Sequence, residues 1–336
     1  MKVAVVFDTP YSDWEDEDFK EEVAAGVEEA EYEVAEALLA REHEVLMVGI
    51  REDLFRLPER LAAFGPELVF NLAEGFCDNP SLDYLFPALL EAYGYRYTGS
   101  PPLTLLATRN KALTKKVLAF HGVPVPRFAT YRPGDPAVLP PGLDFPVIVK
   151  PVGRDASEGI AEASVVRDEA SLQARVEFVH QKFDQPAIAE ELVDGRELYA
   201  GILGNGDDLE ILPIVELVFD KEKTRPEHRI ATTKVKWDEE YRERKGIKNV
   251  FARPISKLAS ERIREIARVA YRALGFRDYA RLDLRLTPGG EVKVIEVNAN
   301  PYLSFGHDLA MAAEKAGMDY YDFIERIAAE ALRRYE

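Results

Sequence analysis

The chain has a single cysteine, no long run of apolar residues, and fewer basic than acidic side chains. The one cysteine, Cys77, excludes a disulfide framework within the chain and any multi-cysteine zinc site. The first apolar run, MKVAVVF, is broken at Asp8 and is too short for a signal peptide, and no later segment approaches the length of a membrane span. We therefore expect a cytoplasmic protein that does not enter a membrane.

The shortage of positive charge limits the partners. Lys and Arg number 43 against 60 Asp and Glu, which gives a formal net charge of -17. Such a charge argues against nucleic acid or an anionic membrane as the main partner. A site for ATP or phosphate must therefore create positive potential locally, and small molecules are the expected partners.

Alternating strand-like and helix-like segments in the first hundred residues predict a parallel sheet with helices on its faces, and so an α/β domain. The later segments indicate two α+β subdomains. We place the boundaries at 1–106, 107–189 and 190–336, with one helix over about 107–121. The polar stretch 221–249 is too long for an ordinary connection, and loops of that length are typically lids or binding loops.

The segment YARLDLRLTPGGEVKVIEVNANP, residues 279–301, gathers four polar side chains. Strands alternate their side chains with period two, so Arg281 and Asp283 share a face, and so do Glu296 and Asn298. With Gly289-Gly290 as a two-residue hairpin loop, Asp283 faces Glu296 and Arg281 faces Asn298. Directly opposed Cβ atoms lie about 4.5 to 5.5 Å apart, so two carboxylates are expected to meet.

Two carboxylates at that distance repel each other unless a cation lies between them. Oxygen ligands without sulfur or paired imidazoles suit a hard ion, above all Mg²⁺, which is usually held by one or two carboxylates and substrate phosphates. The alternative is a solvated charged hairpin. The run VIEVN has the composition of a buried central strand, which favours the metal.

Lys150 ends the apolar strand FPVIVKP, just before the polar loop VGRDASEG that contains Ser157. Successive backbone amides in such a loop make an anion-binding concavity, so the lysine and the loop could hold a phosphate. Each feature also has a structural explanation: a lysine at a strand end is common. Lys111, near a helix start, could simply be exposed.

The segment EELVDGRE, residues 190–197, places carboxylates on both sides of a short turn. A carboxylate such as Glu197 can accept both hydroxyls of a ribose, and extended backbone around Glu191 and Val193 can offer the donor and acceptor that an adenine edge needs. Ordinary acidic surface residues are the alternative.

In order and composition these segments resemble the ATP-grasp superfamily and, within it, the D-alanine–D-alanine ligases. The resemblance extends over nearly the whole chain through YGYRYTGS, HGVPVP, FPVIVKP and EVNANP followed by MAAEKAGM. It implies an ATP-grasp fold and an ADP-forming carboxylate–amine ligase that acts through an acyl phosphate, in a family that is often dimeric.

The resemblance also implies ATP and two Mg²⁺ ions, or Mn²⁺, as cofactors, and it assigns roles position by position. An arginine beside the metals would stabilise the oxyanion of a tetrahedral intermediate, a role suited to a fixed charge and planar donors. The implied residues are Lys111 and Lys150 for the phosphates, Ser157 for the loop that closes over them, Glu190, Glu191 and Val193 for adenine, Glu197 for ribose, Asp283, Glu296 and Asn298 for the metals, and Arg281 for the oxyanion, assisted by a backbone N–H near Tyr302.

Three departures leave the substrates open. The usual segment that grips the first substrate's ammonium is replaced by DTPYSDWEDED, Tyr302 follows Pro301 where the family commonly has glycine, and His307 replaces a serine that binds the acceptor carboxylate. Lys236 or Lys234 could meet a substrate carboxylate instead. A D-amino-acid dipeptide ligase, a ligase for another carboxylate and amine, and a non-catalytic ATP-binding module all remain possible.

Overall fold

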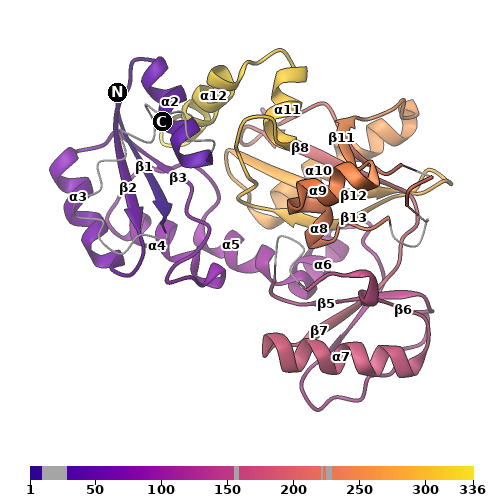
Figure 1. Cartoon of the computed structure of the whole chain (residues 1–336). Coiled ribbons are helices and arrows are strands. Elements are labelled where there is room, and N and C mark those ends of the chain that lie inside the picture. Colours follow the sequence, from indigo (N-terminus) through magenta and orange to yellow (C-terminus); the bar gives the residue numbers. More distant parts are fainter. Residues whose placement is uncertain (10–28, 155–158, 221, 225–228) are drawn as a thin grey trace.

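The computed structural model describes residues 1–9, 29–154, 159–220, 222–224 and 229–336, arranged as three groups of strands with helices around them (Figure 1). The expected fold class is confirmed, with a parallel sheet first and antiparallel sheets after it. The acidic segment Asp13 to Glu22 and the loop residue Ser157 lie outside the described residues. No helix in the described part of the chain is both long and apolar enough to cross a bilayer.

The first sheet is parallel, with strand order β2-β1-β3, and helices cover both of its faces. Val3, Val5 and Phe7 face α2 and α12, whereas Ala4 and Val6 face α3 and α4, as period-two alternation requires. The C-terminal helix α12 thus returns to complete the core of the first unit (Figure 1). The bounds are β1 Lys2–Asp8, α2 Ala30–Ala40, β2 Glu44–Ile50, α3 Leu57–Phe64, β3 Leu68–Asn71, α4 Leu85–Ala92 and α12 Tyr320–Arg333.

The largest sheet has the order β11-β10-β8-β12-β13, with β9 paired to β8. Leu282 and Leu284 of β12 pack under the long helix α10, so their neighbours Arg281 and Asp283 face the opposite side of the sheet, where α11 lies. The bounds are β8 Arg196–Leu203, β9 Glu210–Ile211, β10 Val215–Val218, β11 Lys248–Phe251, α10 Lys257–Leu274, β12 Tyr279–Leu286, β13 Val292–Asn298 and α11 Asp308–Lys315.

The central unit is a four-stranded antiparallel sheet, β4-β7-β5-β6, packed on the helix α7. Strand β5 ends at Pro151 and strand β7 at Glu191, so the two strands carry the expected phosphate-binding and adenine-binding side chains. The bounds are β4 Phe128–Tyr131, β5 Val147–Pro151, β6 Val165–Val166, α7 Glu169–Phe183 and β7 Ala187–Glu191.

The expectation of one helix over 107–121 and that of one long loop over 221–249 were both wrong. The single helix over 107–121 is broken at Asn110, whose extended backbone separates α5 (Pro102–Arg109) from α6 (Lys111–Phe120) and whose side chain caps α6 at Leu113 N. The polar stretch 221–249 is not one loop, because it contains the short helices α8 (Thr233–Trp237) and α9 (Glu239–Lys245) and the start of β11.

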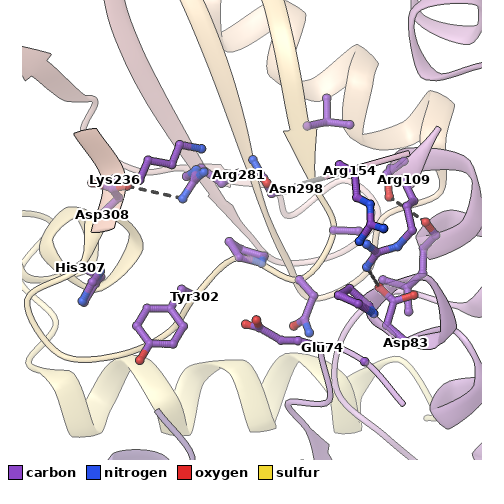
Figure 2. A pocket seen from close by; sticks show the side chains of 18 of the residues that line it. Glu74, Asp83, Arg109, Arg154, Lys236, Arg281, Asn298, Tyr302, His307 and Asp308 are labelled. Carbon is purple, nitrogen blue, oxygen red and sulfur yellow. Dashed lines mark hydrogen bonds and ion pairs between the residues drawn. The ribbon is translucent and has the colours of Figure 1, made fainter. Parts of the chain in front are cut away.

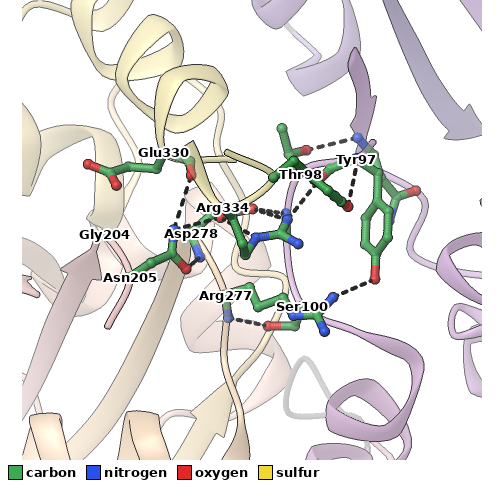
Figure 3. Close-up of polar contacts among 12 residues, drawn as sticks. Tyr97, Thr98, Ser100, Gly204, Asn205, Arg277, Asp278, Glu330 and Arg334 are labelled. Atoms are coloured by element: carbon green, nitrogen blue, oxygen red, sulfur yellow. Dashed lines mark hydrogen bonds and ion pairs between the residues drawn. The ribbon is translucent and has the colours of Figure 1, made fainter. Parts of the chain in front are cut away.

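Asp278 is a buried junction between the first unit, the large sheet and α12 (Figure 3). Its carboxylate accepts hydrogen bonds from Gly99 N at 2.8 Å, Asn205 Nδ2 at 2.9 Å and Arg334 Nη2 at 2.9 Å. Its φ of 64° lies in the left-handed region, which aspartate tolerates better than most residues. One side chain therefore joins three segments that are far apart in the sequence.

Asp278→Ala is expected to lower the free energy of unfolding by about 3–5 kcal/mol, because it leaves the Arg334 guanidinium without its buried counter-charge. Urea unfolding measures the loss. Asp207→Ala is the matched control: Asp207 pairs with Arg272 at 2.8 Å but is fully exposed, so its removal should leave the free energy of unfolding nearly unchanged. Equal losses in the two variants would contradict this role of Asp278.

Glu216 on β10 gives a pH-dependent contribution to stability. Its carboxylate is 1% exposed, and burial alone would raise its pKa, but hydrogen bonds from Arg196 and Arg253 lower the pKa from 4.5 to about 2. The ionised form therefore stabilises the fold above pH 4.5, and this contribution is lost as the pH falls from 4.5 to about 2. Glu216→Gln should be less stable than the wild type at pH 7, with a difference that shrinks toward pH 2 in urea unfolding; a constant difference would refute the assignment.

Candidate functional site

The β12–β13 hairpin brings the four expected polar residues together. Arg281 pairs with Asn298 and Asp283 with Glu296, as predicted. Asp283 Oδ1 accepts hydrogen bonds from Arg281 Nε at 2.8 Å and from Asn298 Nδ2 at 3.2 Å. The two carboxylates are therefore opposed on one face of the large sheet.

The pairing was predicted correctly, but from a turn that is one residue too short and a strand without a bulge. These two errors offset each other. Thr287 N donates to Glu291 O, so the loop holds three residues, Pro288 to Gly290, and Gly290 adopts a φ of 85° as a left-handed bulge residue. That loop shifts the pairing by one residue. A β-bulge at Ile295 shifts it back, because Leu284 pairs with Val294 while Asp283 pairs with Glu296.

The strand β13 was expected to be central, but it lies at the edge of its sheet. It is nonetheless partly buried, because Val294 and Val297 pack in the core beneath α10. Its open edge is covered by α6 and the loop that follows, where Val294 N donates to Pro124 O at 2.8 Å. Burial of the strand thus follows from a covering helix rather than from a further strand.

Arg281 is held rigidly above the sheet. Its guanidinium donates to both oxygens of Asp283, lies 3.4 Å from Asp308 Oδ2 through Nη1, and stacks 5.1 Å from the ring centre of Tyr199. Burial would lower the pKa of Arg281, but the charges of Asp283 and Asp308 outweigh it and raise the pKa. The arginine therefore stays charged at all accessible pH values.

Three buried lysines neutralise the buried Glu190 and the partly buried Glu296 between the hairpin and the central sheet. Lys111 Nζ lies 2.8 Å from Glu296 Oε1, Lys150 Nζ lies 3.0 Å from Glu190 Oε2, and Lys115 Nζ lies 3.4 Å from Glu190 Oε1. Burial would raise the pKa of Glu296 and of Glu190, but the lysines outweigh it and lower both pKa values. The lysines thus provide the local positive charge that a phosphate site in this acidic chain needs.

Lys115 was not among the residues predicted for the site. It lies one helical turn after Lys111 and therefore on the same face of α6, a spacing that the sequence displays. Burial lowers the pKa of Lys115, against the opposing effect of Glu190.

The residues expected at adenine and ribose line a small crevice, of about 60 Å³, between the central sheet and the hairpin. Glu191 is held by Lys293 Nζ at 2.7 Å, and Glu197 Oε2 accepts from Arg285 Nη2 at 2.5 Å. Val193 also lines this inner crevice. Their roles at a nucleotide stay predictions, and the ion pairs show how the glutamates are oriented.

A larger cavity of about 660 Å³, the outer pocket, is lined by Arg281 (Figure 2). Lys236, which lies 3.8 Å from Asp283 Oδ2, lines both the outer pocket and the inner crevice. Lys234 is exposed and does not line either cavity. His307 and Tyr302, the two departures noted in the sequence, both line the outer pocket.

Other charged residues of the outer pocket were not anticipated. Asp308 supports Arg281, and Arg109 Nη2 pairs with Asp83 Oδ2 at 2.5 Å (Figure 2). Glu74 and Arg154 line the same pocket. These residues do not lie on the β12–β13 hairpin, whose alternating side chains predicted Arg281 and Asp283. Local sequence patterns therefore do not predict that they line one pocket.

The donor set fits a divalent cation. Two opposed carboxylates and one carboxamide provide oxygen ligands of the kind that Mg²⁺ prefers. In the described part of the chain no three histidine, cysteine, aspartate or glutamate side chains converge as a metal cluster. The candidate donors are the paired Asp283 and Glu296 together with Asn298, and their role at a metal stays a prediction. The surrounding lysines and Arg281 balance the carboxylates in the structure.

Comparisons with known proteins show the family to which the chain is similar. The family described as "D-ala D-ala ligase C-terminus" matches residues 118–329. The D-alanine–D-alanine ligase of Desulforudis audaxviator is 31% identical over 305 residues, 90% of this chain and 92% of that protein. An uncharacterized protein of Sinorhizobium fredii, y4sG, is 36% identical over 308 residues, 90% of this chain and 87% of that protein.

Solved structures show the same fold. The D-alanine–D-alanine ligase of Bacillus anthracis, in a crystal structure with ATP, superimposes with a TM-score of 0.74 at 20% identity, over 99% of this chain and 98% of that one. The VanG D-Ala:D-Ser ligase of Enterococcus faecalis gives a TM-score of 0.71 at 19% identity, over 98% and 99%. By sequence and by fold, the chain belongs to the D-alanine–D-alanine ligase family of ATP-dependent, ATP-grasp ligases.

Proposed function

We propose that this protein is an ADP-forming carboxylate–amine ligase that activates its carboxylate substrate as an acyl phosphate. The observation that carries the proposal is the position of Arg281. It is fixed by Asp283 and Asp308 and lines the outer pocket, while Asp283 also lines the inner crevice where Lys150 and Glu296 lie. A nucleotide in the crevice and a small substrate in the pocket would meet at this point.

In the proposed reaction a carboxylate oxygen of the first substrate attacks the γ-phosphorus of ATP, and the bond from that phosphorus to ADP breaks. The nitrogen of the second substrate then attacks the acyl carbon, the bond to phosphate breaks, and the nitrogen loses a proton. The products are an amide, ADP and phosphate. A bound divalent cation would neutralise the charge of the transferred phosphoryl group.

The chain's own residues would act by charge and position. Lys111 and Lys150 would contact phosphate oxygens in exchange for their present partners, Glu296 and Glu190. Arg281 would face the oxyanion that forms when the amine attacks, because its donors are fixed before the reaction. Lys236, between the two cavities, would meet the substrate carboxylate. Ser157, outside the described residues, belongs to the loop proposed to close over ATP.

A ligase for substrates other than two D-alanines is the second candidate. His307, Tyr302 and Asp308 line the outer pocket, so its wall presents an imidazole, a phenol and a carboxylate beside Arg281. Burial lowers the pKa of His307, so this imidazole is neutral at pH 7 and is a poor counter-ion for a carboxylate. We therefore keep the acceptor open among amino acids and small amines.

The test is an assay of ADP release with Mg²⁺-ATP and a panel of D- and L-amino acids, singly and in pairs. Stimulation by D-alanine alone would identify a D-alanine–D-alanine ligase. Stimulation by another pair would identify the second candidate. ATP binding without turnover for any pair would refute catalysis and leave an ATP-binding module. The division at residues 106 and 189, a cytoplasmic location and a homodimer stay predictions.

A further inference from the structure

We propose that Lys115 is a positioning residue that holds the β13 bulge, and with it Glu296, in the register that cation binding requires. The proposal rests on the proposed function and deepens it. It starts from one contact: Lys115 Nζ donates to the carbonyl oxygen of Ile295 at 2.6 Å. Ile295 is the extra residue of the bulge, and Glu296 follows it directly.

The contact lies in a continuous seam, which we define as β13 residues 293–296 and their partners from the central unit and α6. Each of four consecutive residues has one anchor there. Lys293 Nζ binds Glu191 at 2.7 Å, Val294 N donates to Pro124 O at 2.8 Å, Ile295 O accepts from Lys115, and Glu296 pairs with Lys111 at 2.8 Å. The seam is where β13 and α6 meet in Figure 1.

A bulge needs such an anchor more than a regular strand does. The extra residue has no cross-strand partner, so the ladder that fixes β12 to β13 is interrupted at the position beside Glu296. On its other side β13 is a sheet edge, so no further strand among the described residues holds Ile295. The lysine ammonium thus replaces a missing ladder hydrogen bond at this point.

The cost of burying Lys115 supports a specific role. Its side chain is 3% exposed, and an ammonium without partners in such a place is strongly unfavourable. Its second partner is Glu190 Oε1, which lies 3.4 Å away and accepts no hydrogen bond within the described structure. Lys115 therefore links the glutamate on β7 to the bulge on β13, and both Glu190 and Ile295 line the inner crevice.

The test uses Lys115→Met, which keeps the length of the side chain and removes the donor and the charge. Calorimetry with a non-hydrolysable ATP analogue, with and without Mg²⁺, separates the two contributions to binding. We expect at least a tenfold loss in the gain of affinity that Mg²⁺ confers, and a similar rise in the Mg²⁺ concentration for half-maximal ADP release. Lys115→Arg should restore part of both. Lys116→Met, at the exposed next position on α6, should match the wild type.

Wild-type Mg²⁺ coupling in Lys115→Met would overturn the proposal. So would an equal loss of nucleotide affinity with and without Mg²⁺, since that pattern indicates a general charge effect rather than a displaced Glu296. Circular dichroism checks the fold, and if the methionine variant does not fold, Lys115→Arg decides: a reduced Mg²⁺ gain supports the proposal and an unchanged one refutes it. Failure of the proposed function is distinct, because the wild type itself would then show no Mg²⁺-dependent binding or turnover.

Discussion

Glu296→Gln is expected to lower the rate of ADP release by about 10²–10³-fold while the protein stays folded. The substitution keeps the shape of the side chain but removes one of two opposed negative charges, so the oxygen set of Asp283, Glu296 and Asn298 loses much of its attraction for a divalent cation. Lys111, 2.8 Å away, also loses its counter-charge.

The measurement is a coupled ADP-release assay across a range of Mg²⁺ and Mn²⁺ concentrations, with thermal unfolding as the check on the fold. Glu291→Gln is the matched control, because Glu291 lies at the turn of the same hairpin and is exposed. It should retain wild-type rates. Normal ADP release from Glu296→Gln at ordinary Mg²⁺ concentrations would refute the metal assignment.

The hairpin shows which features of the site the sequence predicts and which it does not. Strand alternation placed Arg281 with Asp283 and Glu296 with Asn298, because the period of two is local and fixed. The turn was less predictable: Gly289-Gly290 suits a two-residue loop as well as the three-residue loop that forms. The predicted pairing of Asp283 with Glu296 was right only because the bulge at Ile295 offsets the longer turn. No local pattern in VIEVN predicts a bulge.

The site residues that the sequence did not predict are brought there by contacts between distant segments. Asp308 supports Arg281 from the first turn of α11, and Lys115 reaches the bulge from α6, 180 residues away in the sequence. Helical spacing puts Lys115 on the face of Lys111, but which face is buried depends on α10 and β13 covering α6. Likewise, α12 belongs to the first unit because its apolar face fits the sheet there, which order along the chain does not reveal.

Arg281→Lys is expected to lower the turnover number by about 10²-fold or more, with little change in the affinity for ATP. A lysine keeps the charge, but it cannot donate to both oxygens of Asp283 and also reach Asp308, nor can it stack flat on the Tyr199 ring. The positive charge would therefore lose its fixed direction toward the reacting carbonyl, which matters in the transition state more than in substrate binding.

Steady-state kinetics at saturating substrates separates the two effects, because loss of a contact made only in the transition state lowers kcat without raising KM for ATP. Arg262→Lys, on the exposed face of α10, is the matched control and should leave both constants unchanged. If Arg281→Lys instead raises KM for ATP while kcat is kept, the arginine serves the nucleotide rather than the oxyanion. In that case the group that stabilises the tetrahedral intermediate must be sought among the outer-pocket residues that stand opposite it, with the backbone N–H near Tyr302 first.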